Sequence, residues 1–328
     1  MDFAEYKDIL VVLELDEGKP VNVSLENIAA ANAVANGGKV IAVALGCGCA
    51  AQTAIEYGAD SVIVVEGEQF GAYNGDAVSA AIAEIAAEVK PAAIFTGATA
   101  TGKDLVPRIA AKLGAGAVTD AVGLKLDDAG NIVFTTTAYA GNALTDIVID
   151  TVRPQVASIR GGSVPKAEPQ AGKAGDVVTK AITVADDAIK AKIKETVKEI
   201  TEAVNLEEAE VIVAGGRGMG SAENFAALKE LADLLGGVIG CTRPAMESGW
   251  ISRAHQVGQS GKIVAPKVYF AFGISGAAQH VSGMIGSGYI VAINKDEEAP
   301  IFDVADVGIV GNAMDVLPLM IEEIKKIK

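Results

Sequence analysis

The strongest constraint in this sequence is a regular alternation of short β-branched runs with longer alanine-rich stretches. In the first half, the apolar runs are typical of buried strands, and the stretches between them have the length of helices. The expected strands are 9–15, 39–45, 61–65 and 92–96, and the expected helices are 26–36, 50–57 and 76–89. Strands that alternate with helices form βαβ units with parallel strands and right-handed crossovers. The sequence therefore predicts an α/β fold on a mostly parallel sheet.

The pattern changes after Gly123. Three runs lie close together, at 131–138, 146–152 and 156–159, and we expect them to extend the sheet, some of them antiparallel. Glycine and proline then mark 161–180 as a loop or linker. The Lys- and Glu-rich stretch 186–201 predicts a charged helix, either as a solvated face or as a partner contact.

A second strand–helix series follows. Its expected strands are 211–214, 238–241, 268–272, 289–293 and 307–310, and its expected helices are 223–235 and 313–326. Ser221 is placed to cap the first of these helices, and Gly236 to end it. We therefore predict two Rossmann-like α/β domains, with boundaries at 1–180 and 207–328 and with the linker and charged helix at 181–206 between them.

Charge and hydropathy exclude several classes of protein. The chain has 42 Asp and Glu against 27 Lys and Arg, a formal net charge of -15, which argues against nucleic-acid binding. The mean hydropathy is +0.35, yet no run of 18 apolar residues exists, so no membrane insertion is expected. The N-terminal residues resemble neither a signal peptide nor a transit peptide. These observations indicate a cytoplasmic, prokaryotic protein.

Residues with catalytic or metal-binding chemistry are sparse. The three cysteines are Cys47, Cys49 and Cys241, and no neighbouring His or Cys completes a metal set, so we expect reduced thiols and no metal. No Ser/His/Asp, Cys/His or paired-carboxylate arrangement is visible, and we assign no acid–base or nucleophilic catalysis.

Three glycine-rich turns could receive a phosphate. The segment 97–103 fits seven positions of a P-loop, but Asp104 stands where Mg²⁺ binding requires Ser or Thr, so nucleotide hydrolysis is not expected. The turn 215–221 carries Arg217, whose planar guanidinium matches phosphate. The turn 273–280 joins a strand to a helix within a window, 248–295, that holds four Lys or Arg and no Asp or Glu. A positive window in an acidic chain favours an anionic ligand.

A set of motifs in this order carries a family resemblance. The motifs are GGRGMGSAENF, TRP at 242–244, QVGQSGK, GISGAAQHVSGM, AINKDEEAPIF and ADVGIVGN, and TGATATGKDLVPRIAAKLGAG at 96–116 adds the first half. Together they resemble the alpha subunit of electron transfer flavoproteins over nearly the whole chain. The resemblance implies one FAD bound by the C-terminal domain, at an interface with a homologous beta subunit, and an N-terminal scaffold domain that contacts that subunit.

The resemblance also implies which residues bind the cofactor. Arg217 and the turn 275–280 would contact the pyrophosphate and the ring region of FAD. Thr242 and the turn 257–260 would line the isoalloxazine ring and the ribityl chain. Asn294 and Asn312 would hold the adenosine end. The implied set is Arg217, Thr242, Arg243, Gln256, Val257, Gly258, Gln259, Ser260, Gly261, Ser275, Gly276, Ala277, Ala278, Gln279, His280, Asn294 and Asn312. Thr242, Ser260 and Asn312 depart from the family's usual Ser, Thr and Asp.

Three of these residues are expected to tune the flavin. Arg243 and His280 would stabilise the negative charge that reduction places on the ring, and thereby raise the potential of the first electron. Ser260 would reach flavin N5 through its hydroxyl. No residue is expected to be catalytic in its own right.

The implied function is electron transfer between flavin dehydrogenases, such as acyl-CoA dehydrogenases, and a downstream acceptor, with AMP in the partner subunit. An alternative is a bifurcating member that oxidises NADH with a second FAD in the beta subunit. Two readings from other classes stay open: a stand-alone NAD-dependent oxidoreductase, and a nucleotide-binding sensor without redox chemistry. The first lacks a complete dinucleotide fingerprint.

Overall fold

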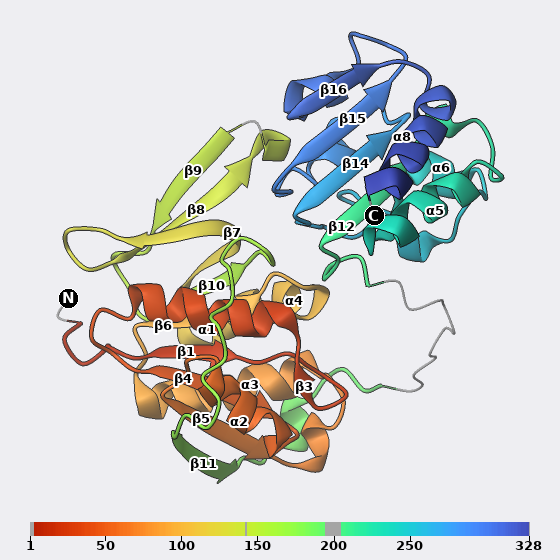
Figure 1. The fold of residues 1–328 in the computed structure, drawn as a ribbon. Coiled ribbons are helices and arrows are strands. Elements are labelled where there is room, and N and C mark those ends of the chain that lie inside the picture. Colours follow the sequence, from red (N-terminus) through yellow and green to blue (C-terminus); the bar gives the residue numbers. More distant parts are fainter. Residues whose placement is uncertain (1–2, 142, 194–204, 328) are drawn as a thin grey trace. The chain divides into compact units, whose positions relative to one another are not determined.

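The computed structural model describes residues 3–141, 143–193 and 205–327. The chain divides into two compact units, one made of Met1–Ala138 and Leu144–Val197 and the other of Tyr139–Ala143 and Lys198–Lys328 (Figure 1). Each unit contains one large sheet, which confirms the predicted pair of α/β domains. The domain boundaries at 180 and 206 stay predictions.

The N-terminal sheet has nine strands in the order β11-β5-β4-β1-β6-β10-β7-β8-β9. Pairing is parallel from β11 to β7, and β7 and β8 are antiparallel, as the close spacing after Gly123 predicts. The strands are β1 (Ile9–Val12), β4 (Val40–Leu45), β5 (Ser61–Glu66), β6 (Ala93–Gly97), β7 (Gly116–Leu126), β8 (Ile132–Ala138), β9 (Ala143–Val148), β10 (Gln155–Ile159) and β11 (Asp176–Ala181).

Helices cover both faces of this sheet, and the alternation of side chains along β1 shows how. Ile9 and Val11 belong to the core under α1 (Asn22–Val34) and α2 (Ala51–Glu56). Leu10 and Val12 belong to the opposite core, under α3 (Gly75–Val89) and α4 (Ala100–Leu113). Apolar residues at every position of the strand are therefore needed, because both faces are buried.

Strand β11 corrects the predicted linker. Residues 176–181 do not cross solvent as a loop; they pair in parallel with β5 at the outer edge of the sheet (Figure 1). The sequence signal is weak because Val177 and Val178 are each about half exposed, so the strand needs no buried run. Of the predicted charged helix, residues 194–201 lie outside the described residues, and the rest contains only the 3-10 turn Asp186–Ala188.

The P-loop-like segment 97–103 forms an ordinary strand-to-helix turn. Strand β6 ends at Gly97 and α4 begins at Ala100, so little loop remains to surround a phosphate. The Thr99 hydroxyl accepts the Gly102 N–H at 3.0 Å and donates to the Glu14 carboxylate at 2.6 Å. Asp104 accepts from the Tyr73 hydroxyl at 2.7 Å, and this bond, with that from Arg108, keeps the pKa of Asp104 low. Two carboxylates stand beside this turn, and their charge would repel a phosphate.

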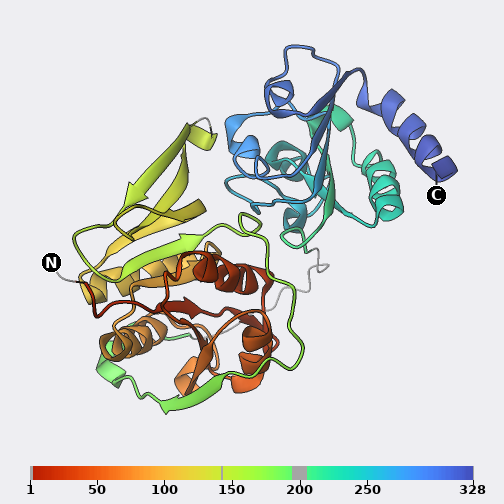
Figure 2. The same ribbon diagram turned by 60° about the vertical axis from the view of Figure 1, so that its left-hand side comes forward.

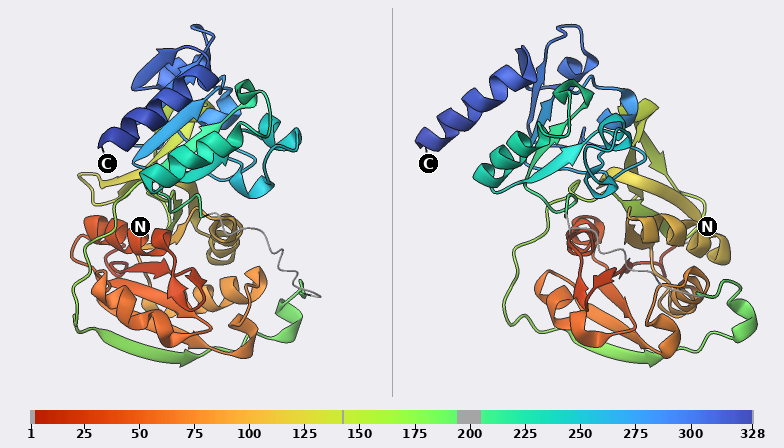
Figure 3. Two further views of the ribbon diagram at one scale, coloured as in Figure 1. Left: turned by 45° about the vertical axis from the view of Figure 1, so that its right-hand side comes forward. Right: turned by 90° about the vertical axis from the view of Figure 1, so that its right-hand side faces the viewer.

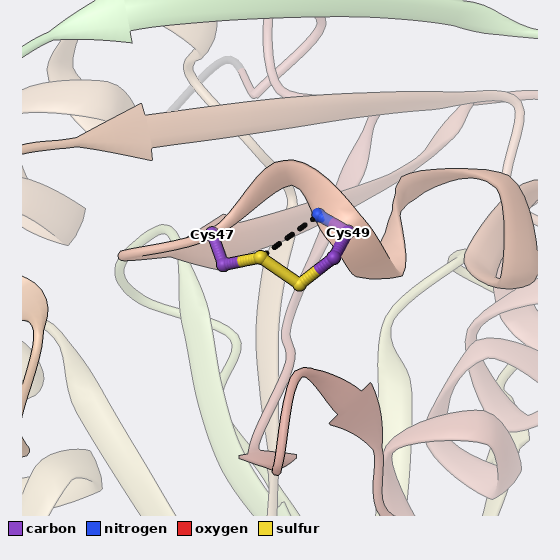
Figure 4. Close-up of a disulfide and its surroundings, with 2 residues drawn as sticks. All are labelled: Cys47 and Cys49. Carbon is purple, nitrogen blue, oxygen red and sulfur yellow. Dashed lines mark hydrogen bonds between the residues drawn. A yellow bond between two sulfur atoms is a disulfide. The ribbon is translucent and has the colours of Figure 1, made fainter.

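The expectation of three reduced thiols is wrong for two of them. Cys47 and Cys49 form a disulfide on the turn that follows β4 (Figure 4). The 3-10 turn Gly48–Ala50 folds the chain back at this point, and the resulting Cα–Cα distance of 5.4 Å lies within the range that a disulfide spans. Cys241 is free and buried.

The C-terminal sheet has five parallel strands in the order β13-β12-β14-β15-β16. The strands are β12 (Val211–Gly215), β13 (Val238–Cys241), β14 (Val268–Phe272), β15 (Ile290–Asn294) and β16 (Val307–Val310). One face is covered by α5 (Phe225–Leu235) and α8 (Ala313–Ile327), which pack together in one core (Figure 2). The other face is covered by the segments 257–264 and 274–285, the second of which includes α7 (Ala278–Val281), and by the 3-10 helix Pro300–Val304 (Figure 3).

The caps of α5 agree with the sequence at only one end. Gly236 ends the helix in the left-handed region, with φ +68°, as predicted. Ser221 is not the cap at the start; Asn224 takes that position, and its side chain donates back to the Met219 carbonyl instead of capping the helix.

No helix within the described residues is long and apolar enough to cross a membrane.

Candidate functional site

The strand order of the C-terminal sheet defines where a ligand is expected. The chain passes from β12 outward to β13 and then returns to the other side of β12 to form β14. In open parallel sheets, ligands bind beyond the carboxyl ends of the strands at the point where the order reverses. The turns that leave β12 and β14 are 215–221 and 273–277, the two turns that the sequence singles out.

All five strands of this sheet deliver predicted residues to the same edge. Parallel strands have their carboxyl ends together. The residues that follow or end the strands are Arg217 for β12, Thr242 for β13, Ser275 for β14, Asn294 for β15 and Asn312 for β16. The structure therefore brings to one edge of one sheet residues that are almost 100 positions apart in sequence.

The two glycine turns approach each other backbone to backbone. Gly218 N–H donates to the Gly273 carbonyl at 3.0 Å, and Gly273 has φ +60°. A Cβ at Gly216 would lie 2.3 Å from the Gly273 oxygen, and one at Gly218 would lie 2.7 Å from the Gly273 Cα. No side chain larger than hydrogen fits between the turns. Arg217 and Ser275 stand on them and are exposed.

The turn 256–262 is fixed to two neighbouring elements. Val257 N–H donates to the Cys241 carbonyl at the end of β13, and Gln259 N–H donates to the Gln279 carbonyl in α7. The Gln256 side-chain amide donates to the Ser260 hydroxyl at 3.0 Å. Because that hydroxyl acts as the acceptor, its own proton is not used in this bond. The exposed Ser260 hydroxyl can still donate to a ligand, as the predicted N5 contact requires.

His280 is bonded on both ring nitrogens. Its Nδ1 lies 3.1 Å from the Val257 carbonyl, which can only accept, so Nδ1 carries the proton. Its Nε2 lies 3.0 Å from the Tyr269 hydroxyl, which donates to it in the neutral tautomer. Burial lowers the pKa of His280 to about 4, against a raising effect of the Val257 carbonyl.

In this arrangement neither ring nitrogen of His280 is available as the flavin donor that the resemblance implies. The ring instead ties the turn 256–262 to β14. Tyr269 is a partner that sequence reasoning missed, because a tyrosine inside an apolar strand carries no signal beyond core packing. Direct contact of His280 with a cofactor stays a prediction.

Arg243 begins the short helix α6 (Arg243–Glu247). Its Nε donates to the Glu247 carboxylate one turn later at 2.7 Å, and the Arg243 side chain is 63% exposed. The pair is solvated and contributes little to stability. The guanidinium therefore stands at the edge of the sheet with only one of its five N–H groups used by this bond.

Thr242 is the least satisfied polar group of the site. The residue is buried, with 8% of its surface exposed, and within the described residues its Oγ1 has no hydrogen-bond partner. It precedes α6, yet its side chain makes no capping bond. A buried hydroxyl without a partner costs about 1–3 kcal/mol. A ligand with a polar atom at this position would remove that cost, so the donor set fits the cofactor that the sequence predicts.

Asn294 and Asn312 both form hydrogen bonds within the protein. Asn294 donates from Nδ2 to the Ile274 carbonyl at 2.8 Å and accepts the Asp296 N–H, so it holds the turn after β14. Asn312 accepts the Met314 N–H at 3.2 Å at the start of α8. Their contacts with an adenosine stay predictions.

Two further observations concern the positive charges of the C-terminal unit and the side chains that could bind a metal. Of the four cations in the window 248–295, Lys267 is bonded to Glu210 outside the window at 2.7 Å. The described residues contain no group of three His, Cys, Asp or Glu side chains that could hold a metal ion. Lys267 directly precedes β14 and therefore stands at the opposite edge of the sheet, whereas Arg217 and Arg243 follow β12 and β13 at the carboxyl edge and suit an anionic ligand.

Both units of the chain match known protein families. Residues 9–184 match the family described as the electron transfer flavoprotein domain, and residues 205–285 match the electron transfer flavoprotein FAD-binding domain. The electron transfer flavoprotein subunit alpha of Thermoanaerobacterium thermosaccharolyticum is 44% identical over 99% of both chains. That of Megasphaera elsdenii is 44% identical over 100% of this chain and 99% of its own. A protein of Anaerotignum propionicum named acryloyl-CoA reductase electron transfer subunit beta is 37% identical over 99% and 97%.

The buried His280 makes stability depend on pH in a defined direction. Unfolded histidine has a pKa of 6.5 and takes up a proton below that pH, whereas folded His280 does so only near pH 4. Stability is therefore full above pH 6.5 and falls as the pH drops toward 4. Between pH 7.5 and 5, we expect wild type to lose about 2 kcal/mol more than His280→Gln in urea unfolding.

A histidine titration by NMR should also show one ring with a pKa near 4. Equal pH slopes for wild type and His280→Gln would contradict the neutral, doubly bonded ring.

Proposed function

The chain belongs to the electron transfer flavoprotein family, as an alpha subunit, and from that premise we propose that it shuttles electrons between flavin dehydrogenases and a downstream acceptor. In this proposal one FAD binds at the carboxyl edge of the five-stranded sheet. The flavin supplies the electron chemistry, and the protein supplies binding, orientation and electrostatics. The observation that carries the proposal is the convergence of residues from all five strand ends on that edge.

Different residues are proposed for the pyrophosphate, the ring and the adenosine end of FAD. The turns 215–221 and 273–277 follow strand ends, the first carries the exposed Arg217, and both are proposed for the pyrophosphate. Thr242, Arg243 and the Ser260 hydroxyl lie on the strand-end turns proposed for the ring. Asn294 and Asn312 follow the last two strands and would hold the adenosine end.

The partners follow from the relatives' names. An alpha subunit implies a beta subunit, and one relative is named as an electron transfer subunit of a reductase that acts on a CoA thioester. We therefore propose a heterodimer that serves a dehydrogenase of acyl-CoA type. The cytoplasmic location stays a prediction.

Co-expression with the beta subunit, followed by flavin and nucleotide analysis of the purified heterodimer, tests this proposal. One FAD per heterodimer, AMP and a flavin visible spectrum are the expected result. Two flavins with NADH oxidation would replace the proposal by the bifurcating alternative. A colourless heterodimer would contradict FAD binding. It would favour the two alternatives without a flavin, the NAD-dependent oxidoreductase and the nucleotide-binding sensor.

A substitution at Thr242 can distinguish an effect on FAD binding from an effect on folding. Thr242→Val removes the unpartnered hydroxyl but keeps the shape, so the protein without FAD should keep its stability or gain about 1 kcal/mol. FAD affinity should fall about tenfold, because a ligand hydrogen bond is lost. Thr242→Ser keeps the hydroxyl and is the control. Unchanged FAD affinity in Thr242→Val, measured by titration of the stripped protein, would contradict the contact.

Arg243 is proposed to raise the potential of the first electron. A charge-assisted hydrogen bond of about 1.4 kcal/mol corresponds to about 60 mV for a one-electron couple, so Arg243→Ala should lower the midpoint by tens of millivolts. Glu247→Gln removes the partner carboxylate and keeps the guanidinium, and should leave the midpoint unchanged or higher. A redox titration of Arg243→Ala with FAD bound and an unaltered midpoint would rule out this role.

A further inference from the structure

The N-terminal unit contains a cavity that the FAD site does not involve. Its volume is about 440 Å³, and it lies at the carboxyl ends of the three central strands, where Val12, Leu45 and Gly97 line it. This volume lies within the range of about 300–1,000 Å³ that small-molecule sites occupy. The sheet order reverses between β1 and β6, so the cavity stands where a ligand of such a sheet is expected.

A disulfide forms part of the wall of this cavity. Cys47 lines it directly, on the turn that leaves β4, and is bonded to Cys49 two residues later (Figure 4). Cys49 is exposed and Cys47 is half-buried. The hairpin of β2 (Leu15–Asp16) and β3 (Lys19–Pro20) passes beside them, and a Cβ at Gly18 would lie 2.9 Å from the Cys49 sulfur. Exposed disulfides are the ones that react, whereas structural ones are protected.

We propose that Cys47 and Cys49 form a reversible dithiol–disulfide site that exchanges with small neutral or cationic thiols. The proposal concerns the N-terminal unit and does not depend on the function assigned to the C-terminal one.

The geometry indicates which sulfur is attacked. The Cys49 N–H donates to the Cys47 sulfur at 3.0 Å, and a hydrogen bond of this kind stabilises a thiolate on Cys47. An incoming thiolate therefore attacks the exposed Cys49 sulfur. The S–S bond breaks, its electron pair stays on Cys47, and that thiolate then takes a proton from solvent.

A second thiol completes the exchange. Its thiolate attacks the small-molecule sulfur of the mixed disulfide and releases Cys49 as a thiolate, which is protonated in turn. Two small thiols are thereby oxidised to one disulfide, and two electrons and two protons reduce the protein disulfide to a dithiol. The reverse reaction, with a small disulfide, restores the bond.

Charge around the cavity selects among thiols. Among the described residues that line it are the carboxylates of Glu14 and Glu17, and no Lys, Arg or His is among them. Glu14 accepts a hydrogen bond from Thr99, which does not remove its charge. Cys49 itself does not line the cavity, and the exposed Lys19 follows Gly18 beside it, so these carboxylates act on a thiol that approaches from the cavity side. They repel an anionic thiol and attract a cationic one, and Lys19 offsets part of this effect. At about 6 Å in water, each unit charge changes a rate roughly threefold.

The test uses the heterodimer with the full chain and N-ethylmaleimide as the trap, followed by mass spectrometry. Protein purified in air should gain no adduct under native conditions, and protein treated with dithiothreitol should gain two, on Cys47 and Cys49. Cys241 is the internal control: it is buried, and burial raises the pKa of its thiol to about 12, so it should react only after unfolding. Cystamine, the disulfide of cysteamine, should restore the unreactive state when it is added after dithiothreitol is removed and before the trap.

Selectivity is measured with cysteamine and 2-mercaptoethanesulfonate at equal thiolate concentration. Cysteamine should reduce the pair roughly three- to tenfold faster at low salt, and salt or Glu17→Gln should narrow the difference. Two adducts in the air-purified protein, or none after dithiothreitol, would each overturn the reversible site. Equal rates for the two thiols would overturn the charge selection. These readouts do not involve the flavin, so they stand apart from the flavin count.

Discussion

The parallel pairing of β12 with β14 is the interaction on which the candidate FAD site depends. Because the two strands are neighbours, their two glycine turns emerge side by side, and Gly218 can donate to Gly273 across the gap. A Cβ on either turn would collide with the other backbone. The other parallel strands end at the same edge of the sheet. Arg217, Thr242 and Ser275, which follow the three neighbouring strands β12, β13 and β14, therefore lie at one edge.

The two units use the same kind of sheet edge in opposite ways. In the N-terminal unit, the turn after β6 is closed by the Thr99 hydroxyl, and the carboxylates of Glu14 and Asp104 stand beside it. In the C-terminal unit, the turns after β12 and β14 carry bare glycines and an exposed Arg217. The carboxylates beside the first edge disfavour a phosphate, and the second edge is the one that we propose for the pyrophosphate of FAD. The two sheets therefore differ in the charge that they present at this edge.

The sequence predicts those strands whose own residues form a clear apolar run. The runs 238–241, 268–272 and 307–310 match β13, β14 and β16 residue for residue, because each is a continuous run without a charged residue. Strand β11 is missed because its two valines stand between charged and polar residues, and its pairing with β5 joins segments more than 100 residues apart. The predicted binding residues converge because parallel strands share an edge. Side-chain partners are a different matter: the Tyr269–His280 bond, the Arg243–Glu247 pair and the unpartnered Thr242 hydroxyl depend on three-dimensional geometry that periodicity does not contain.

Strand β11 also sets how the N-terminal unit is closed. Without it, β5 would be the outermost strand, and its backbone N–H and C=O groups would face solvent as a template for another chain. After β11 the chain still contributes to the core, since Ile182 and Val184 are buried against the α3–α4 side. A folding unit cut at residue 160 would therefore expose a long apolar edge that promotes aggregation. The segment that reads as a linker in the sequence therefore replaces an apolar edge strand with one that carries Asp176 and Lys180, and charged residues on an edge strand disfavour pairing with another chain.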